Sequence, residues 1–208
     1  MNGSRAATAA DSNGDISARR DPGTVRRVGH RETGYSASAV DAAIERFDDA
    51  LARWAEDPAV ETIGAAEVRQ VTFERERGGY DPHDVDDLLD AYEDRFAEAE
   101  KVAYCRREGD QAWHEHSAAL ADLVMGRLTR ERGNRFRRPA HRRVEGYFVG
   151  DVDDLCDRLE EYFRTESHVE PSVIRRSSFR TATRKHAYDE VQVDAFLDTA
   201  IQLIQALR

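Results

Sequence analysis

The sequence predicts an all-α protein in which one small helical unit is used four times. First, apolar residues recur at the spacing of one helix face over most of residues 25–208. Second, a tyrosine followed five residues later by Val-Asp occurs four times. Third, glycine and helix-capping residues stand just before several of the predicted helices. Recurrence of this kind is the signature of a repeat architecture.

The recurring motif is a tyrosine and, at constant spacing, a Val-Asp pair. After each valine, the residues at +3, +4, +7 and +11 are apolar or small, which places one apolar stripe along a helix. Such a stripe cannot be buried alone, so the helices must pack on one another or on a second chain. The four copies are Tyr35 with Val40 and Asp41, Tyr80 with Val85 and Asp86, Tyr147 with Val152 and Asp153, and Tyr188 with Val193 and Asp194.

The helix starts have a physical explanation. In the second copy Asp81 is a good N-cap and Pro82 suits the first turn, while Tyr80 and Val85 have the spacing of a hydrophobic staple. The fourth copy repeats this pattern with Asp189, and the first copy offers a serine cap at residue 36. The third copy has a phenylalanine at the cap position, so its helix start is less well defined.

Each unit is predicted to consist of a short helix, a basic loop, a Gly-Tyr turn and a longer amphipathic helix. Short helices are expected at residues 65–70 and 171–176, and an extra helix at about 111–132. The predicted organisation is a disordered tail (1–24), a degenerate unit (25–60), a full unit (61–108), an inserted helix (109–133), a degenerate unit (134–167) and a full unit (168–208).

Composition limits the class of protein. A net charge of −10 argues against a uniformly basic nucleic-acid binder and against broad adhesion to an anionic membrane. Two cysteines outside any metal-binding spacing suggest a reducing, cytoplasmic location. No apolar run reaches the roughly 20 residues that span a bilayer, and no signal peptide is visible.

The sequence gives no reason to expect catalysis, a metal or a cofactor. No phosphate-binding loop, nucleophile elbow or zinc-protease motif occurs. The rings of His114 and His116 diverge on a helix and lack a third ligand nearby, which favours solvated surface over a metal site. The four equivalent aspartates of the Val-Asp pairs favour a structural role, in the first helical turns or paired with a loop arginine, over paired catalytic carboxylates.

The second and fourth copies resemble the DivIVA domain of bacterial cell-pole and division-site scaffolds. Residues 63–92 match through Val68, Phe73, Gly79, Tyr80, Asp81, Val85, Asp86 and Leu89. Residues 174–198 match through Ile174, Phe179, Tyr188, Asp189, Val193, Asp194, Phe196, Leu197 and Asp198. The first and third copies keep the tyrosine, valine and aspartate but lack the upstream phenylalanine at its usual distance.

The resemblance implies a non-enzymatic scaffold or adaptor that gathers division or polar-growth proteins at poles or septa. Family members self-associate through a long coiled coil and expose an aromatic residue beside an arginine to the membrane. Here no heptad pattern is sustained, and the corresponding positions hold Arg77 and Gly78, and Lys185 and His186. The resemblance therefore implies protein contacts, possible self-association and at most weak membrane contact.

Clusters of arginine leave three interpretations open. The favoured one is that solvated linkers pair with acidic helix faces such as those of Asp84, Asp87, Asp90 and Asp94. The second is contact with anionic lipid or a partner protein, and the third is nucleic-acid binding, which would make the chain a DNA-associated regulator with helix-turn-helix-like pairs. The candidate contact residues are Arg75, Arg77, Arg180, Arg184 and Lys185.

Overall fold

A computed structural model describes residues 25–57, 63–141, 143–165 and 171–208. The predicted tail at 1–24 lies outside the described residues. The protein is mostly helical with a few short strands. Its first half contains β1 (Thr33–Tyr35), α1 (Ala37–Glu56), α2 (Ala65–Arg69), β2 (Arg75–Arg77) and α3 (Pro82–Glu108). Its second half contains α4 (Asp110–Leu128), β3 (Glu145–Phe148), α5 (Val149–Thr165), α6 (Ser172–Arg175), β4 (Thr181–Thr183), β5 (Ala187–Tyr188) and α7 (Glu190–Ala206).

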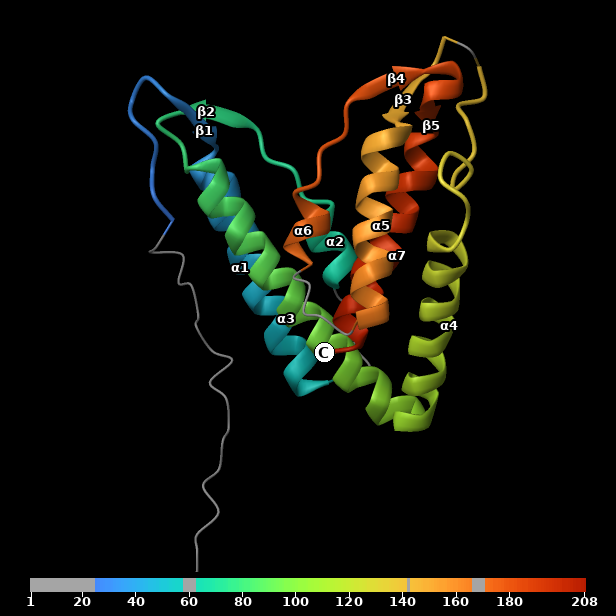
Figure 1. The fold of residues 1–208 in the computed structure, drawn as a ribbon. Helices are drawn as coiled ribbons and strands as arrows, with labels where there is room; N and C mark the ends of the chain where they lie inside the picture. Colours follow the sequence, from blue (N-terminus) through green and yellow to red (C-terminus); the bar gives the residue numbers. More distant parts are fainter. Residues whose placement is uncertain (1–24, 58–62, 142, 166–170) are drawn as a thin grey trace, which may run out of the picture.

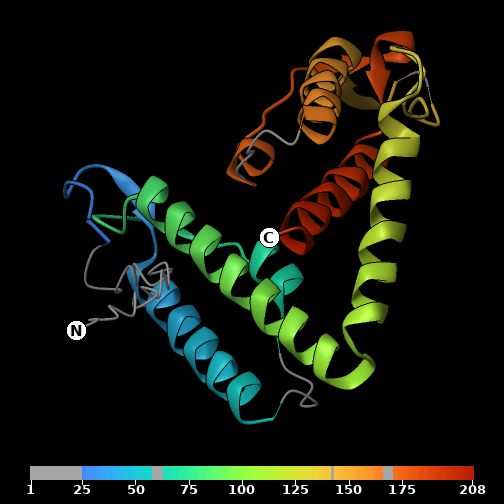
Figure 2. The ribbon, with the colours of Figure 1, turned by 60° about the horizontal axis from the view of Figure 1, so that its bottom comes forward.

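The helices form two arms that meet at an open angle (Figure 1). The first arm contains α1 and α3, and the second contains α4, α5 and α7. The short helices α2 and α6 lie between the arms, and the strands lie at the far ends of both (Figure 1). The chain passes from one arm to the other at the corner between α3 and α4 (Figure 2).

Each arm has its own hydrophobic core. The first is built around Val40, Phe47, Val85 and Phe96, all at most 1% exposed, and α1 packs on α3 there. The second is built from α4, α5, α6 and α7, together with the loop residue Phe136 and the strand residue Tyr188. The apolar stripes predicted on all four long helices supply residues to these cores.

Short antiparallel strands form where the sequence suggested only turns and basic loops. β1 pairs with β2, with Gly34 opposite Glu76. In the second half β3 lies between β4 and β5. These strands are two to four residues long and their burial does not alternate cleanly, so hydrophobic periodicity could not reveal them.

The prediction of a mainly helical fold is confirmed, and so are two of the predicted N-caps. The side chains of Asp81 and Asp189 accept hydrogen bonds from the backbone of His83 and Gln192, as expected of N-caps. Ser36 occupies the N-cap position of α1 but makes no side-chain capping bond. Instead, a carboxylate oxygen of Glu76 in β2 accepts the hydrogen bond from the first backbone amide of α1, at 2.8 Å.

Across the described ranges, every helix is too short or too polar to cross a lipid bilayer.

Candidate functional site

In the first half, the two Gly-Tyr segments cross at their backbones. The amide of Tyr35 donates to the carbonyl of Tyr80 at 2.9 Å, and the amide of Tyr80 donates to the carbonyl of Tyr35 at 2.8 Å. A side chain on Gly34 would place its Cβ 2.2 Å from the Tyr80 carbonyl oxygen, and one on Gly79 would lie equally close to the oxygen of Tyr35. Both glycines are therefore required by the close approach of the two segments.

The second half crosses in the same way. Tyr147 of β3 lies opposite Tyr188 of β5 in an antiparallel register. A Cβ on Gly146 would lie 2.1 Å from the Tyr188 carbonyl oxygen. Only Ala187, the residue that replaces glycine in the fourth motif, carries a side chain at such a position, and it is fully buried.

The tyrosine of one segment binds the Val-Asp aspartate of the other. The hydroxyl of Tyr80 donates to Asp41 at 3.0 Å, and the hydroxyl of Tyr188 donates to Asp153 at 3.0 Å. Burial raises the pKa of Asp194, and a hydrogen bond from the Tyr147 hydroxyl opposes that increase.

The remaining aspartate of the motif, Asp86, behaves in the same way. Burial raises its pKa, and a hydrogen bond from the Tyr35 hydroxyl opposes the increase. Each of the four recurring aspartates therefore faces a tyrosine from the neighbouring segment.

Arginines that precede the first and third motifs complete the crossing. The guanidinium of Arg27 lies over the Tyr80 ring at 5.0 Å, and that of Arg138 lies over the Tyr188 ring at 4.8 Å. Such cation–π contacts attract the guanidinium to the face of the tyrosine ring. The two halves thus share the same set of local contacts.

A buried arginine is specific to the second half. Arg135 is 3% exposed and lies in the loop between α4 and β3. Its guanidinium donates to the backbone carbonyls of Leu128 and Asp153 and to the carboxylate of Asp157. It therefore anchors the loop to the end of α4 and to the start of α5. Its Nη1 also lies 3.7 Å from Oδ1 of Asp153, so this Val-Asp aspartate has a loop arginine nearby, as expected.

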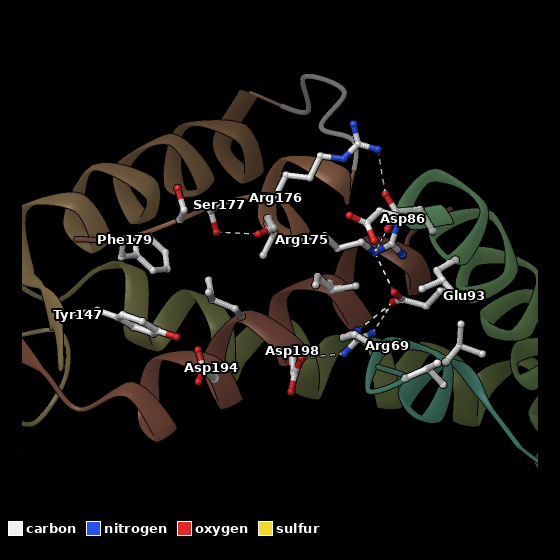
Figure 3. Close-up of a pocket in the computed structure, with 18 residues that line it drawn as sticks. Arg69, Asp86, Glu93, Tyr147, Arg175, Arg176, Ser177, Phe179, Asp194 and Asp198 are labelled. Carbon is white, nitrogen blue, oxygen red and sulfur yellow. Dashed lines mark hydrogen bonds and ion pairs between the residues drawn. The ribbon is translucent and has the colours of Figure 1, made fainter. Parts of the chain in front are cut away.

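A cleft of about 880 Å³ lies between the two arms (Figure 3). The first half contributes residues of α2 and α3, and the second contributes α6, α7, Tyr147 and Phe179. Its walls mix apolar side chains with a network of charges, and Arg69, Glu93 and Arg175 lie together at one end (Figure 3).

Glu93 is the centre of the charge network. Its side chain is 3% exposed, and Arg69 Nη2 donates to its Oε1 at 2.6 Å. Arg175 Nε lies 2.8 Å from its Oε2, although this ion pair lacks the alignment of a hydrogen bond and leaves that nitrogen without a hydrogen-bond acceptor. One buried carboxylate from the first half thus binds one arginine from each half.

The same network links the halves reciprocally. Arg69 of α2 also pairs with Asp198 of α7 at 3.0 Å. Arg175 of α6 pairs in turn with α3, at 3.5 Å from Asp90 and 2.8 Å from Asp94. Arg69 and Arg175 each follow a buried aliphatic residue in a short helix, which is the sequence signal that could have identified them together.

The predicted pairing of arginines with acidic helix faces is confirmed. Arg26 binds Asp84 through two nitrogens, and the pKa of Asp84 is lowered well below its usual range, chiefly by this hydrogen bonding. Arg176 pairs with Asp87 and Asp90 on α3. Most of these pairs are exposed and each contributes little to stability.

The candidate contact residues divide into two groups. The guanidinium of Arg75 stacks on Tyr35, and that of Arg180 pairs with Asp151, so both have intramolecular roles. Arg77, Arg184 and Lys185 are exposed at the strand ends of the two arms and form no ion pair within the described ranges. We call these three residues the basic tips.

Two kinds of reactive site can be examined in the part of the chain that the structure describes: metal-binding clusters and reactive thiols. Among the described residues no group of histidine, cysteine and acidic side chains is placed to hold a metal ion. Burial raises the pKa of Cys156 to about 12, so its thiol stays protonated and is a poor nucleophile. The polar groups of the cleft are engaged mainly with one another.

Comparison with known proteins gives no match, whether to family models, to curated proteins or to solved structures.

Proposed function

We propose that the chain is a non-catalytic scaffold or adaptor of bacterial cell division or polar growth, built from four DivIVA-like units. The first unit pairs with the second and the third with the fourth. The observation that carries the proposal is how the motif residues contact one another. The glycines allow two backbone segments to approach closely, and the tyrosine of one segment binds the aspartate of the other.

Pairing within the chain suits an adaptor. Because the amphipathic helices of all four units already contribute to cores within the chain, the chain presents a preformed surface. Preorganised surfaces bind without a large ordering cost. The function we propose is therefore to hold partner proteins in a fixed arrangement.

The basic tips are the surface we assign to these contacts. The strands that carry or flank them lie at the same side of the molecule, at the free ends of the two arms (Figure 1). A cation near an anionic leaflet contributes about 1 kcal/mol, so three such residues support only weak lipid binding. Acidic surfaces of partner proteins are the main targets in this proposal.

The test is the localisation of a fluorescent fusion at native expression. The wild-type chain should accumulate at poles or septa, and a variant with Arg77→Ala, Arg184→Ala and Lys185→Ala should lose most of this accumulation. The matched control replaces exposed arginines of α1 and α5 by Arg46→Ala, Arg53→Ala and Arg158→Ala. A wild-type fusion that stays diffuse throughout the cell cycle contradicts the proposal.

The same variants separate the proposal from a DNA-binding function. A DNA-associated regulator would shift DNA in a mobility assay at low salt, with affinity falling steeply as salt rises. The scaffold proposal predicts no such shift. A salt-dependent shift abolished in the tip variant, together with a fusion that follows the nucleoid, would favour the regulator.

A further inference from the structure

The two arms are joined by a single residue. α3 ends at Glu108, α4 begins at Asp110, and Gly109 between them has φ of 90° and ψ of 160°. This backbone conformation is essentially restricted to glycine. Figure 2 shows the resulting sharp corner between the two helices.

The chain crosses between the arms only at this corner. Within the described ranges, residues 25–108 form the first arm with its core, and residues 109–208 form the second. α4 belongs to the second arm, because Leu120, Val124 and Leu128 lie in the second core. Each arm therefore has its own core, and the chain connects the two arms at one point.

The face between the arms combines apolar side chains with a network of charges, and it is incompletely filled. It carries the ion pairs of Arg69, Glu93 and Arg175, and it contains the cleft of about 880 Å³. In this contact, arginines of each arm pair with carboxylates of the other. Any surface that offers the same charges in the same places can replace the other arm.

We propose that a second copy of this chain supplies that surface, in a dimer in which two chains exchange their second arms. Gly109 becomes helical, and α3 and α4 merge into one helix over residues 82–128, about 70 Å long at a rise of about 1.5 Å per residue. The first arm of one copy then binds the second arm of the other through the contacts described above. This proposal rests on the corner and the face between the arms, and it does not depend on the scaffold function.

The contacts that are lost on opening lie near the corner. Near the corner, the ring of Tyr104 in α3 lies 5.4 Å from Trp113 and 5.5 Å from His116 in α4. These ring contacts stabilise the closed corner, and glycine at position 109 can adopt the backbone angles that the corner requires. All contacts further from the corner are recovered in the exchanged dimer, because the two copies carry the same residues.

The test uses two glycine-to-alanine variants. Gly109→Ala disfavours the closed corner and favours the continuous helix, whereas Gly126→Ala in α4 raises helix propensity away from the corner at a site with nothing within 4 Å. In each chain, Gly109→Ala should shift the equilibrium from the closed corner toward the continuous helix by about tenfold. A dimer contains two corners, so the association constant of Gly109→Ala should be about a hundredfold above that of the wild type. Size-exclusion chromatography with light scattering measures this rise, and Gly126→Ala should match the wild type.

Energy transfer distinguishes exchange of arms from ordinary association. Donor and acceptor dyes are attached through Glu45→Cys on α1 and Glu161→Cys on α5, both exposed positions, in a Cys105→Ala background. Doubly labelled Gly109→Ala is then refolded with an excess of unlabelled chain. Exchange predicts lower transfer than in the monomer, because the labelled arms of one chain are no longer paired with each other.

Two outcomes overturn the proposal: a Gly109→Ala protein that stays monomeric, and a dimer whose energy transfer equals that of the monomer. If Gly109→Ala does not fold, the wild-type chain is refolded from urea at high and at low concentration. A dimer trapped at high concentration, with the reduced energy transfer, supports exchange. A monomer at both concentrations rejects it.

Discussion

Replacing Arg175 by methionine tests the charge network between the arms. The side chain of Arg175 is 9% exposed, contacts Glu93 Oε2 and donates to Asp94 at 2.8 Å. Methionine keeps the aliphatic contacts in the face between the arms but removes the charge. The matched control is Arg176→Met on the same short helix, whose side chain is 48% exposed and also pairs with α3.

The magnitude follows from what Glu93 loses. Breaking a buried ion pair costs about 3–5 kcal/mol when the remaining charge has no partner. Glu93 keeps Arg69 at 2.6 Å, so the expected cost for Arg175→Met is smaller. We estimate about 2–3 kcal/mol, or about 4–12 °C in Tm for a chain of this size. The control should cost at most about 1 kcal/mol, because its pairs are largely exposed to solvent.

Urea unfolding measures both variants, followed by circular dichroism and by tryptophan fluorescence. Trp54 reports on the first arm and Trp113 on the second, so separate unfolding of the arms would be seen as two transitions. Equal costs for Arg175→Met and Arg176→Met would refute the central position of Glu93 in the face between the arms.

Three further predictions concern the crossings. Gly146→Ala should destabilise the fold by more than about 2 kcal/mol, because its Cβ would lie 2.1 Å from a carbonyl oxygen. The control Gly126→Ala should stabilise the fold slightly, and comparable urea midpoints for the two variants would contradict the prediction. Tyr188→Phe leaves the buried Asp153 without its phenol donor and should lower the free energy of unfolding by about 2–3 kcal/mol. Tyr80→Phe, at the more exposed pair with Asp41, should lower it by about 1 kcal/mol or less. Urea unfolding measures both, and a larger loss of stability at Tyr80 than at Tyr188 would contradict the reasoning. Burial first, and then aspartate contacts, raise the pKa of Tyr147 and of Tyr188 to about 12, so the folded chain retains these protons above the ordinary pKa of 10.0. Stability should therefore be full below about pH 10 and fall as the pH rises toward about 12, and Tyr147→Phe should reduce this decline. A urea midpoint that does not change over this pH range would exclude the effect.

The sequence predicted the helices and their buried faces well. The stripe residues Val40, Phe47, Val85 and Phe96 lie in one core, because periodicity on a long helix directly reports which face is buried. The capping aspartates were also found, since capping depends on residues close in the chain. Both signals are local.

The contacts between distant segments were not visible in the same way. Glu93 lies on a charged helix and looks like a solvated residue, yet it is buried because α2 and α6 bring arginines to it from far away in the chain. The tyrosine–aspartate contacts likewise join residues of different motifs. The constant spacing indicated that the tyrosine and the aspartate of the motif have related roles. It did not show which copy supplies the aspartate that each tyrosine binds.

The most direct measurement of the central claim, that the recurring motif pairs segments within one chain, is a double-mutant cycle on Tyr188 and Asp153. The cycle compares Tyr188→Phe, Asp153→Asn and the double variant by urea unfolding at a protein concentration where the chain is monomeric. A hydrogen bond to a buried charge predicts a coupling of about 1.5–3 kcal/mol that does not change when the protein is diluted. A coupling near zero, or one that disappears on dilution, would contradict pairing within the chain.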